Sequence, residues 1–161
     1  MLAQRDFLLE RLAHARAELV DLIPQAPTDR DIYPNWTIKE YLDHLAGWDD
    51  AVVEALHAHA KGEPIPQTVA RGINAYNAQT VSTRETIDLE HTRREFFASR
   101  EAVIKAMNDL PDAKFDQPLV FPWGERGTVA YFIEIFVDHD EHHAAHLAQW
   151  LKNPDQVIGE H

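Results

Sequence analysis

Four long segments of this 161-residue chain carry apolar residues at the three- and four-residue spacing of an amphipathic helix. Each segment ends at a proline, a glycine or an Asn-Pro pair, and no stretch shows the alternation of a strand. Amphipathic helices must bury their apolar faces against one another, so we expect an all-α bundle formed by residues 1–161 as a single domain. The predicted helices span residues 2–23, 37–61, 82–110 and 128–152. Their apolar faces include Phe7, Leu8, Leu12 and Leu19, then Ile38, Leu42 and Leu45, then Phe96, Phe97 and Val103, and finally Phe132, Phe136 and Trp150.

Two motifs predict where helices begin. Thr37-Ile38-Lys39-Glu40 has the pattern of a capping box, in which the Thr and Glu side chains satisfy free backbone N–H groups, and Ser82-Thr83-Arg84-Glu85 has the same pattern. Between them, residues 69–81 indicate either a short helix or an ordered loop, because Gly72 and three amide side chains weaken a helix there. Residues 113–127 indicate a loop that packs aromatic side chains against the bundle. These connections are long for an up-down-up-down bundle, so we expect at least one to cross over, with a long crossover or an ordered loop between the second and third helices.

The chain is acidic and contains no cysteine. Its formal net charge of -12 disfavours binding to nucleic acid or to an anionic membrane surface, both of which need clustered Lys and Arg. The lack of cysteine excludes disulfides, zinc–thiolate sites and cysteine nucleophiles. No apolar stretch reaches the roughly 18 residues that span a bilayer, and the N-terminal residues lack the pattern of a signal peptide. We therefore expect a cytoplasmic protein whose metal ligands, if any, are His, Asp, Glu or carbonyl oxygen.

Four histidines lie within eight residues of the last predicted helix: His139, His142, His143 and His146. At about 100° per residue, His139, His143 and His146 fall within roughly 60° of one another on the face that carries Phe132, Phe136 and Trp150. Buried imidazoles need partners for their ring nitrogens and cannot all be charged together. A cation shared by neutral imidazoles satisfies both conditions, and the i, i+4 spacing of His139 and His143 brings two rings to one point.

A third ligand has to come from another helix, and His44, beside the apolar face of the second predicted helix, is the best candidate. Three imidazoles with an open fourth position would be a site of the catalytic type. The simpler alternatives are a solvated histidine-rich helix and, for His44, a core histidine that is only hydrogen-bonded. His142 lies off the histidine face, so we expect it to be partly exposed or to support a ligand. His146 is either a ligand, a hydrogen-bonding partner of one, or a core histidine.

Two motifs carry a resemblance to a known family. His44-Leu45-Ala46-Gly47-Trp48 and His139-Asp140-Glu141-His142-His143 resemble the DinB-like superfamily, which includes the bacillithiol and mycothiol transferases. The resemblance extends from the first helix to Trp150. It implies an antiparallel four-helix bundle, one divalent metal ion (zinc or nickel foremost) held by His44, His139 and His143, a small-molecule substrate and a homodimer.

A narrower resemblance is to the ClbS/DfsB group within that superfamily. It rests on the segment from Asn35 to Trp48 and on Gly72-Ile73-Asn74-Ala75-Tyr76-Asn77. The last helix departs from the Gly-Gln ending common elsewhere in the superfamily, since it reads His-Ala-Ala-His-Leu-Ala-Gln from His143. The candidate pocket residues are Trp48, Tyr76, Asn77 and His146.

Three functions are compatible with these features. The first is a metal-dependent thiol transferase or hydrolase, in which the metal activates water or an external low-molecular-weight thiol. Asp49, Asp140 and Glu141 are acidic candidates for a base, although Glu141 lies opposite the histidine face. The second is a ClbS/DfsB-like resistance protein that binds or detoxifies a reactive small molecule without obligatory metal. The third is a metal-binding or interaction module whose helices mediate dimerisation.

Overall fold

The computed structural model describes residues 2–159 and confirms the all-α bundle. Its four long helices are α1 (Leu2–Leu22), α2 (Ile38–Lys61), α4 (Leu89–Asp109) and α6 (Val129–Lys152). The shorter elements are the 3-10 turn η1 (Ile23–Gln25), α3 (Ile73–Ser82), α5 (Asp112–Phe115) and a two-stranded antiparallel ribbon of β1 (Leu119–Val120) and β2 (Arg126–Gly127). No described helix is long and apolar enough to cross a bilayer.

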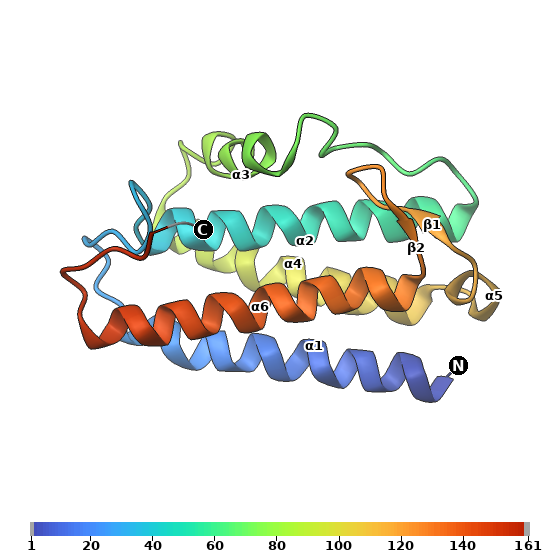
Figure 1. The fold of residues 1–161 in the computed structure, drawn as a ribbon, viewed down its shortest axis with the longest axis horizontal. Helices are drawn as coiled ribbons and strands as arrows, with labels where there is room; N and C mark the ends of the chain where they lie inside the picture. Colours follow the sequence, from blue (N-terminus) through green and yellow to red (C-terminus); the bar gives the residue numbers. More distant parts are fainter. Residues whose placement is uncertain (1, 160–161) are drawn as a thin grey trace.

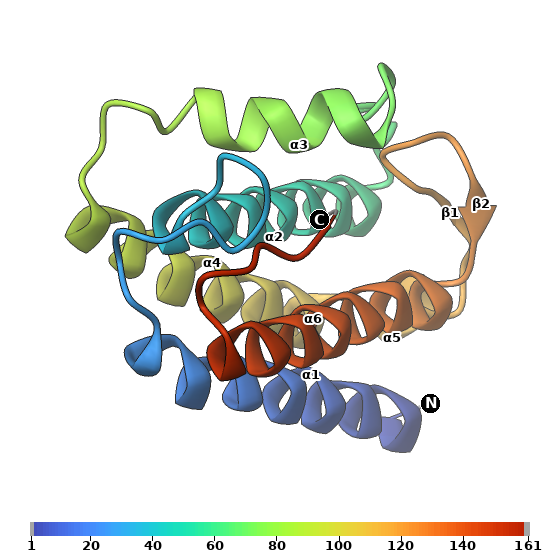
Figure 2. The ribbon, with the colours of Figure 1, turned by 60° about the vertical axis from the view of Figure 1, so that its left-hand side comes forward.

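The helices follow an up-down-down-up order, because the connection between α2 and α4 crosses over the bundle (Figure 1). α1 packs against α6 in the same direction, α2 packs against α4 in the same direction, and the two pairs are antiparallel to each other (Figures 1 and 2). The expected long connection between the second and third long helices is therefore confirmed. It contains α3, which lies along the outer face of α2.

One predicted capping box is confirmed and the other is wrong. Thr37 and Glu40 form a complete capping box at the start of α2. Ser82, by contrast, is the last residue of α3, and α4 begins only at Leu89, with Asp88 as the N-cap that accepts a hydrogen bond from the His91 backbone N–H. The turn between them is fixed by tertiary contacts of Arg84, whose guanidinium bonds carboxylates on α2 and α4. These contacts override the local capping pattern.

Two aromatic residues predicted to face the core are exposed. Phe7 is 57% and Phe97 is 52% exposed, whereas their neighbours Leu8 and Phe96 are buried. Each pair of adjacent apolar residues can place only one member on the inward face of its helix. The aromatic packing expected between residues 113 and 127 is confirmed, because Phe121 of the ribbon turn stacks on Phe132 of α6 at 4.9 Å between ring centroids. The same segment also forms α5 and the ribbon, which the sequence pattern did not predict.

The apolar core consists of two clusters with a layer of charge between them. One cluster holds Leu12, Val52, Val103 and Val137, and the other holds Leu19, Leu45, Phe96 and Ala144. Between these positions each long helix places one buried charged residue, namely Arg16, Asp49, Arg100 and Asp140. The histidines predicted as metal ligands border this layer, because His139 directly precedes Asp140 on α6.

Candidate metal centre

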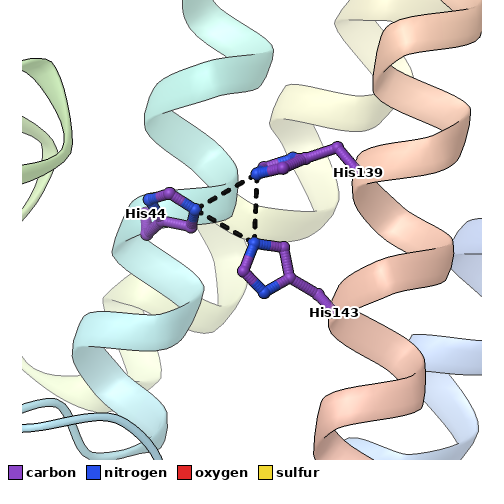
Figure 3. Close-up of side chains that lie close together, drawn as sticks. All are labelled: His44, His139 and His143. Atoms are coloured by element: carbon purple, nitrogen blue, oxygen red, sulfur yellow. Dashed lines mark hydrogen bonds between the residues drawn. The ribbon is translucent and has the colours of Figure 1, made fainter. Parts of the chain in front are cut away.

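Three imidazole rings from two antiparallel helices converge on one point (Figure 3). His44 lies on α2, and His139 and His143 lie one turn apart on α6. The Nε2 atom of His44 is 3.3 Å from that of His139 and 3.1 Å from that of His143, and the last two are 3.0 Å apart. His44 and His143 are buried and His139 is half-buried. The geometry thus brings together the three residues nominated as ligands, and the group could hold a metal ion.

The donor atoms of this cluster fit a metal ion better than they fit one another. A neutral imidazole has one N–H and one lone pair, so three Nε2 atoms in mutual contact cannot all be paired by hydrogen bonds. Nitrogen ligands at about 2.0–2.1 Å from a tetrahedral zinc ion are about 3.3–3.4 Å apart. The observed spacings of 3.0–3.3 Å are close to that value. A cation would therefore turn the mutual repulsion of the lone pairs into attraction with little movement of the rings.

Burial keeps the imidazoles neutral. Desolvation lowers the pKa of His139 to about 4, and the neighbouring charges of Asp140 and Asp49 only partly oppose this effect. Desolvation, reinforced by the four nearby imidazoles of its cluster and helix, lowers the pKa of His143 well below its ordinary value. Both rings are therefore unprotonated near neutral pH, which is the state that binds metal.

Tyr33, in the loop before α2, fixes the orientation of His143. Its hydroxyl lies 2.8 Å from Nδ1 of His143 and 2.8 Å from Nδ1 of His146. When Nδ1 of His143 donates to Tyr33 Oη, the hydroxyl donates to His146 and the Nε2 lone pair of His143 faces the cluster. Tyr41 of α2 also donates to the backbone carbonyl of His143, at 2.9 Å. Side chains outside the cluster thus fix the orientation of one of its rings, and the Tyr33 hydroxyl can stabilise the tautomer that a metal ligand requires.

Substitution of Tyr33 by phenylalanine is expected to weaken metal binding by about 10–100-fold, because loss of a partner that orients a ligating histidine has effects of that size. Competition with a chromophoric chelator measures the affinity. Tyr131→Phe is the matched control, since Tyr131 is 48% exposed and makes no contact with the cluster. Equal affinities of the two variants would show that Tyr33 does not orient His143.

A cavity of about 550 Å³ opens beside the cluster, and all three histidines line it. Most of its wall surface is aromatic or aliphatic, and the polar side chains besides the three histidines are Asn77, Asp138 and His142. The lining residues besides the three histidines are Trp48, Trp123, Phe136, Ile73, Ile135, Asn77, Asp138 and His142. A mostly apolar cavity with a few convergent polar groups is typical of a small-molecule site.

The structure divides the four candidate pocket residues into two pairs. Trp48 and Asn77 line the cavity. Tyr76 lies behind Trp48, with its ring edge-on to the indole at 4.7 Å and its hydroxyl donating to the Gly47 carbonyl at 2.7 Å. His146 lies outside the lining residues and contacts Tyr33 instead. His142 is exposed, as expected, and its ring packs on that of His146 at 4.1 Å.

Gly47 explains part of the motif that precedes Trp48. A Cβ atom at this position would lie 2.3 Å from Cγ2 of Thr80, so the side chain of Thr80 occupies the space that glycine leaves open. This close approach, together with the Tyr76 hydrogen bond to Gly47, seats α3 directly on α2. Asn77 reaches the cavity wall because α3 lies this close.

The acidic residues that the sequence offered as bases are not available to the site. Asp49 and Asp140 are buried and each bonds both Arg16 and Arg100, at 2.7–3.4 Å. Although burial alone would raise the pKa of Asp140, the two arginines hold it below the ordinary value. A carboxylate held by two guanidinium groups is a poor proton acceptor. Glu141 is exposed and absent from the cavity wall, as its position opposite the histidine face indicated.

Tyr33 and the cavity residues Trp123 and Ile73 were missed as site residues. A signal for Tyr33 exists in Tyr33-Pro34-Asn35-Trp36, because Pro followed by Asn suits the central positions of a tight turn. Asn35 indeed has a positive φ of 64°, and the backbone N–H of Trp36 bonds the carbonyl of Tyr33. The turn could be predicted, but its contact with α6 depends on tertiary packing.

Comparison with known proteins identifies the family and the fold. A family model described as the DinB superfamily matches residues 3–147. The chain is similar to the crystal structure of the mycothiol-dependent maleylpyruvate isomerase, with a TM-score of 0.70 and 17% identity over 87% of this chain and 60% of that one. A histidine-to-alanine variant of that enzyme gives a TM-score of 0.69 and 16% identity with the same coverage. The chain thus spans about 60% of the length of these structures. No curated protein sequence matches it.

Proposed function

This chain belongs to the DinB superfamily, and from that premise we propose that it binds one divalent metal ion through His44, His139 and His143. We further propose that it uses the ion to transfer a thiol, or to add water, to a small reactive molecule. The observation that carries the proposal is the convergence of three Nε2 atoms, 3.0–3.3 Å apart, on the wall of an apolar cavity. A metal ion held by three imidazoles would keep a fourth position for water or substrate, as in catalytic rather than structural sites.

The thiol of such a reaction has to be external, because the chain contains no cysteine. The structural neighbours are described as mycothiol-dependent, which supports a low-molecular-weight thiol as co-substrate. A bound divalent ion supplies Lewis acidity that makes a thiol or water nucleophilic near neutral pH. Zinc and nickel are the leading candidates, since both accept imidazole ligands. The homodimer and the cytoplasmic location stay predictions.

The residues of the chain position the reactants. Trp48, Trp123 and Phe136 form the aromatic wall against which an apolar electrophile packs next to the imidazoles. That wall also limits the access of bulk water to the reacting atoms. His142 is the exposed imidazole at the cavity rim, and it can pass the proton released from the nucleophile to solvent. No carboxylate needs to serve as base in this arrangement.

A ClbS/DfsB-like binding protein is the second candidate. It is favoured by the finding that Trp48 and Asn77, which come from the two segments that resemble that group, line the cavity together. Such a protein would hold or consume a reactive molecule stoichiometrically, with no need for the metal.

Turnover distinguishes the two candidates. The metal-loaded protein is incubated with 1-chloro-2,4-dinitrobenzene together with one thiol at a time: mycothiol, bacillithiol or glutathione. Thioether formation is followed by absorbance. In this reaction the sulfur–carbon bond forms as chloride leaves and the thiol proton passes to solvent. We expect many product molecules per chain with at least one thiol, and loss of this activity after chelation. Product limited to one per chain, or turnover that is unaffected by metal removal, would contradict the proposed enzyme.

A further inference from the structure

The side chain of Asn77 is held in one orientation inside the cavity wall. It is 3% exposed, and its Oδ1 accepts a hydrogen bond of 2.8 Å from the indole Nε1 of Trp48. Because an indole N–H can only donate, the oxygen of the carboxamide must face Trp48. Tyr76, one residue earlier, ties the same helix to the Gly47 carbonyl. The amide end of Asn77 is therefore fixed by two neighbouring contacts between α3 and α2.

The amide nitrogen of Asn77 has no acceptor within residues 2–159. It is also not among the polar atoms that are sealed from solvent, and the residue lines the cavity. The two N–H groups of the Asn77 amide are thus available to a ligand at the wall of the cavity that the three histidines also line.

The charge of the cavity restricts what these donors can receive. No Lys or Arg is among the lining residues, while Asp138 lies at the rim and the whole chain carries a net charge of -12. The remaining wall is dominated by Trp48, Trp123 and Phe136. Apart from the proposed metal ion, the wall offers no cationic partner, so an anionic ligand would lose hydration there without gaining an ion pair with a side chain.

We infer that the cavity takes a neutral organic molecule with an aromatic or branched apolar body, and that the amide of Asn77 donates to a carbonyl or similar oxygen of that molecule. This inference rests on the proposed function, since it names the substrate class of the same site. Asn77 is a specificity-determining residue in this assignment, because it selects molecules that present an uncharged oxygen acceptor beside an apolar body.

Two probes of nearly equal shape test the donor. Acetophenone presents a carbonyl oxygen, and α-methylstyrene places a CH2 group at the same position. Their dissociation constants are measured by ligand-observed NMR titration on the metal-loaded protein, on Asn77→Asp and on the control Asn74→Asp, whose site is exposed on the same helix. Asn77→Asp keeps an acceptor for the Trp48 indole and removes the donor.

We expect Asn77→Asp to weaken acetophenone binding at least fivefold and to leave α-methylstyrene within twofold of the unsubstituted protein. Asn74→Asp should change neither. The carboxylate of Asn77→Asp could itself bind the metal ion. The variant Asn77→Ser controls for this effect, because it also loses the amide donors but introduces no carboxylate, and it should weaken acetophenone binding in the same way. Equal acetophenone binding in all forms, or equal loss of both probes in the two Asn77 variants, would overturn the role of Asn77.

Benzoate tests the charge requirement. On chelator-treated protein, where a metal cannot attract the carboxylate, we expect benzoate to bind at least tenfold more weakly than acetophenone. Benzoate binding as tight as acetophenone would overturn the neutral-ligand assignment. Elemental analysis of the same samples separates this inference from the proposed function. Protein that lacks metal but discriminates the probes through Asn77 supports the ligand class while contradicting the metal-dependent reaction.

Discussion

Replacement of His143 by alanine is expected to reduce bound metal from about one ion per chain to less than a tenth of that amount. The Nε2 atom of His143 lies within 3.0–3.1 Å of both other Nε2 atoms, so its loss leaves two ligands from different helices. Two imidazoles rarely suffice for a firm site in a protein, where three ligands are the usual minimum. Elemental analysis after metal loading and gel filtration measures the content.

His142→Ala is the matched control, because it removes the neighbouring imidazole from the exposed side of the same helix. It should keep at least four fifths of the wild-type metal content, whereas His44→Ala and His139→Ala should behave like His143→Ala. Far-ultraviolet circular dichroism shows whether each variant still folds. Wild-type metal content in His143→Ala, or an equal loss in His142→Ala, would mean that the ion is not bound by the three converging imidazoles.

The pair on α6 could be predicted from the sequence, and the third histidine only in part. His139 and His143 share a helical face with Phe132 and Phe136, and this relation is local, so periodicity alone places both rings inward. Which histidine of α2 faces them depends on how the two helices are aligned, and periodicity does not determine that alignment. The nomination of His44 rested partly on its place beside the apolar face of its helix and partly on the resemblance to the superfamily.

Tertiary packing accounts for the parts of the site that the sequence did not predict. Tyr33 lies in a loop that approaches α6 only in the folded bundle, and 110 residues separate it from His143 in the chain. The start of α4 was misplaced because the Ser82 pattern is local, while the contacts of Arg84 with α2 and α4 are not. The presence of four long helices was predicted correctly, because their apolar periodicity is repeated over many turns.

The buried charge layer could be recognised only in part from the sequence, because periodicity shows the position of an arginine but not its partner. Arg16 follows Ala15 and precedes Leu19, and Arg100 lies between Phe96 and Val103, so both arginines occupy core positions of their helices. An arginine at such a position requires a buried partner. The identity of the partners, Asp49 and Asp140, becomes evident only when all four helices are assembled.

Substitution of Asp49 by asparagine is expected to lower the free energy of unfolding by about 3–5 kcal/mol, the cost typical of removing one partner of a buried ion pair. Asp49 accepts hydrogen bonds from Arg16, Arg100 and the Ser99 hydroxyl, at 2.9–3.4 Å. Without its charge, Asp140 alone has to compensate two buried guanidinium groups. For a chain of this length the melting temperature should fall by roughly 10 °C. Urea titration and thermal melts of the chelator-treated protein measure the effect free of any stabilisation by metal.

The adjacent residue provides the matched control. Asp50 also pairs with an arginine, at 2.6 Å from Arg84, but its side chain is 58% exposed. Asp50→Asn should therefore cost less than about 1 kcal/mol, as exposed ion pairs do. If both substitutions had equal effects, burial would not be what makes the charge layer important.

A double variant tests whether the charges act as a unit. Asp49→Asn combined with Arg100→Met removes one charge of each sign and leaves the pair of Arg16 and Asp140, whose atoms lie 3.1 Å apart. Each single substitution is expected to be costly because it leaves an unbalanced charge. In that case the double variant should lose at least 1 kcal/mol less free energy of unfolding than the two single variants lose in sum. Strict additivity would instead mean that each side chain contributes through its own packing. A layer that acts as a unit would hold the four helices in one alignment, and that alignment is what brings His44 to the two histidines of α6.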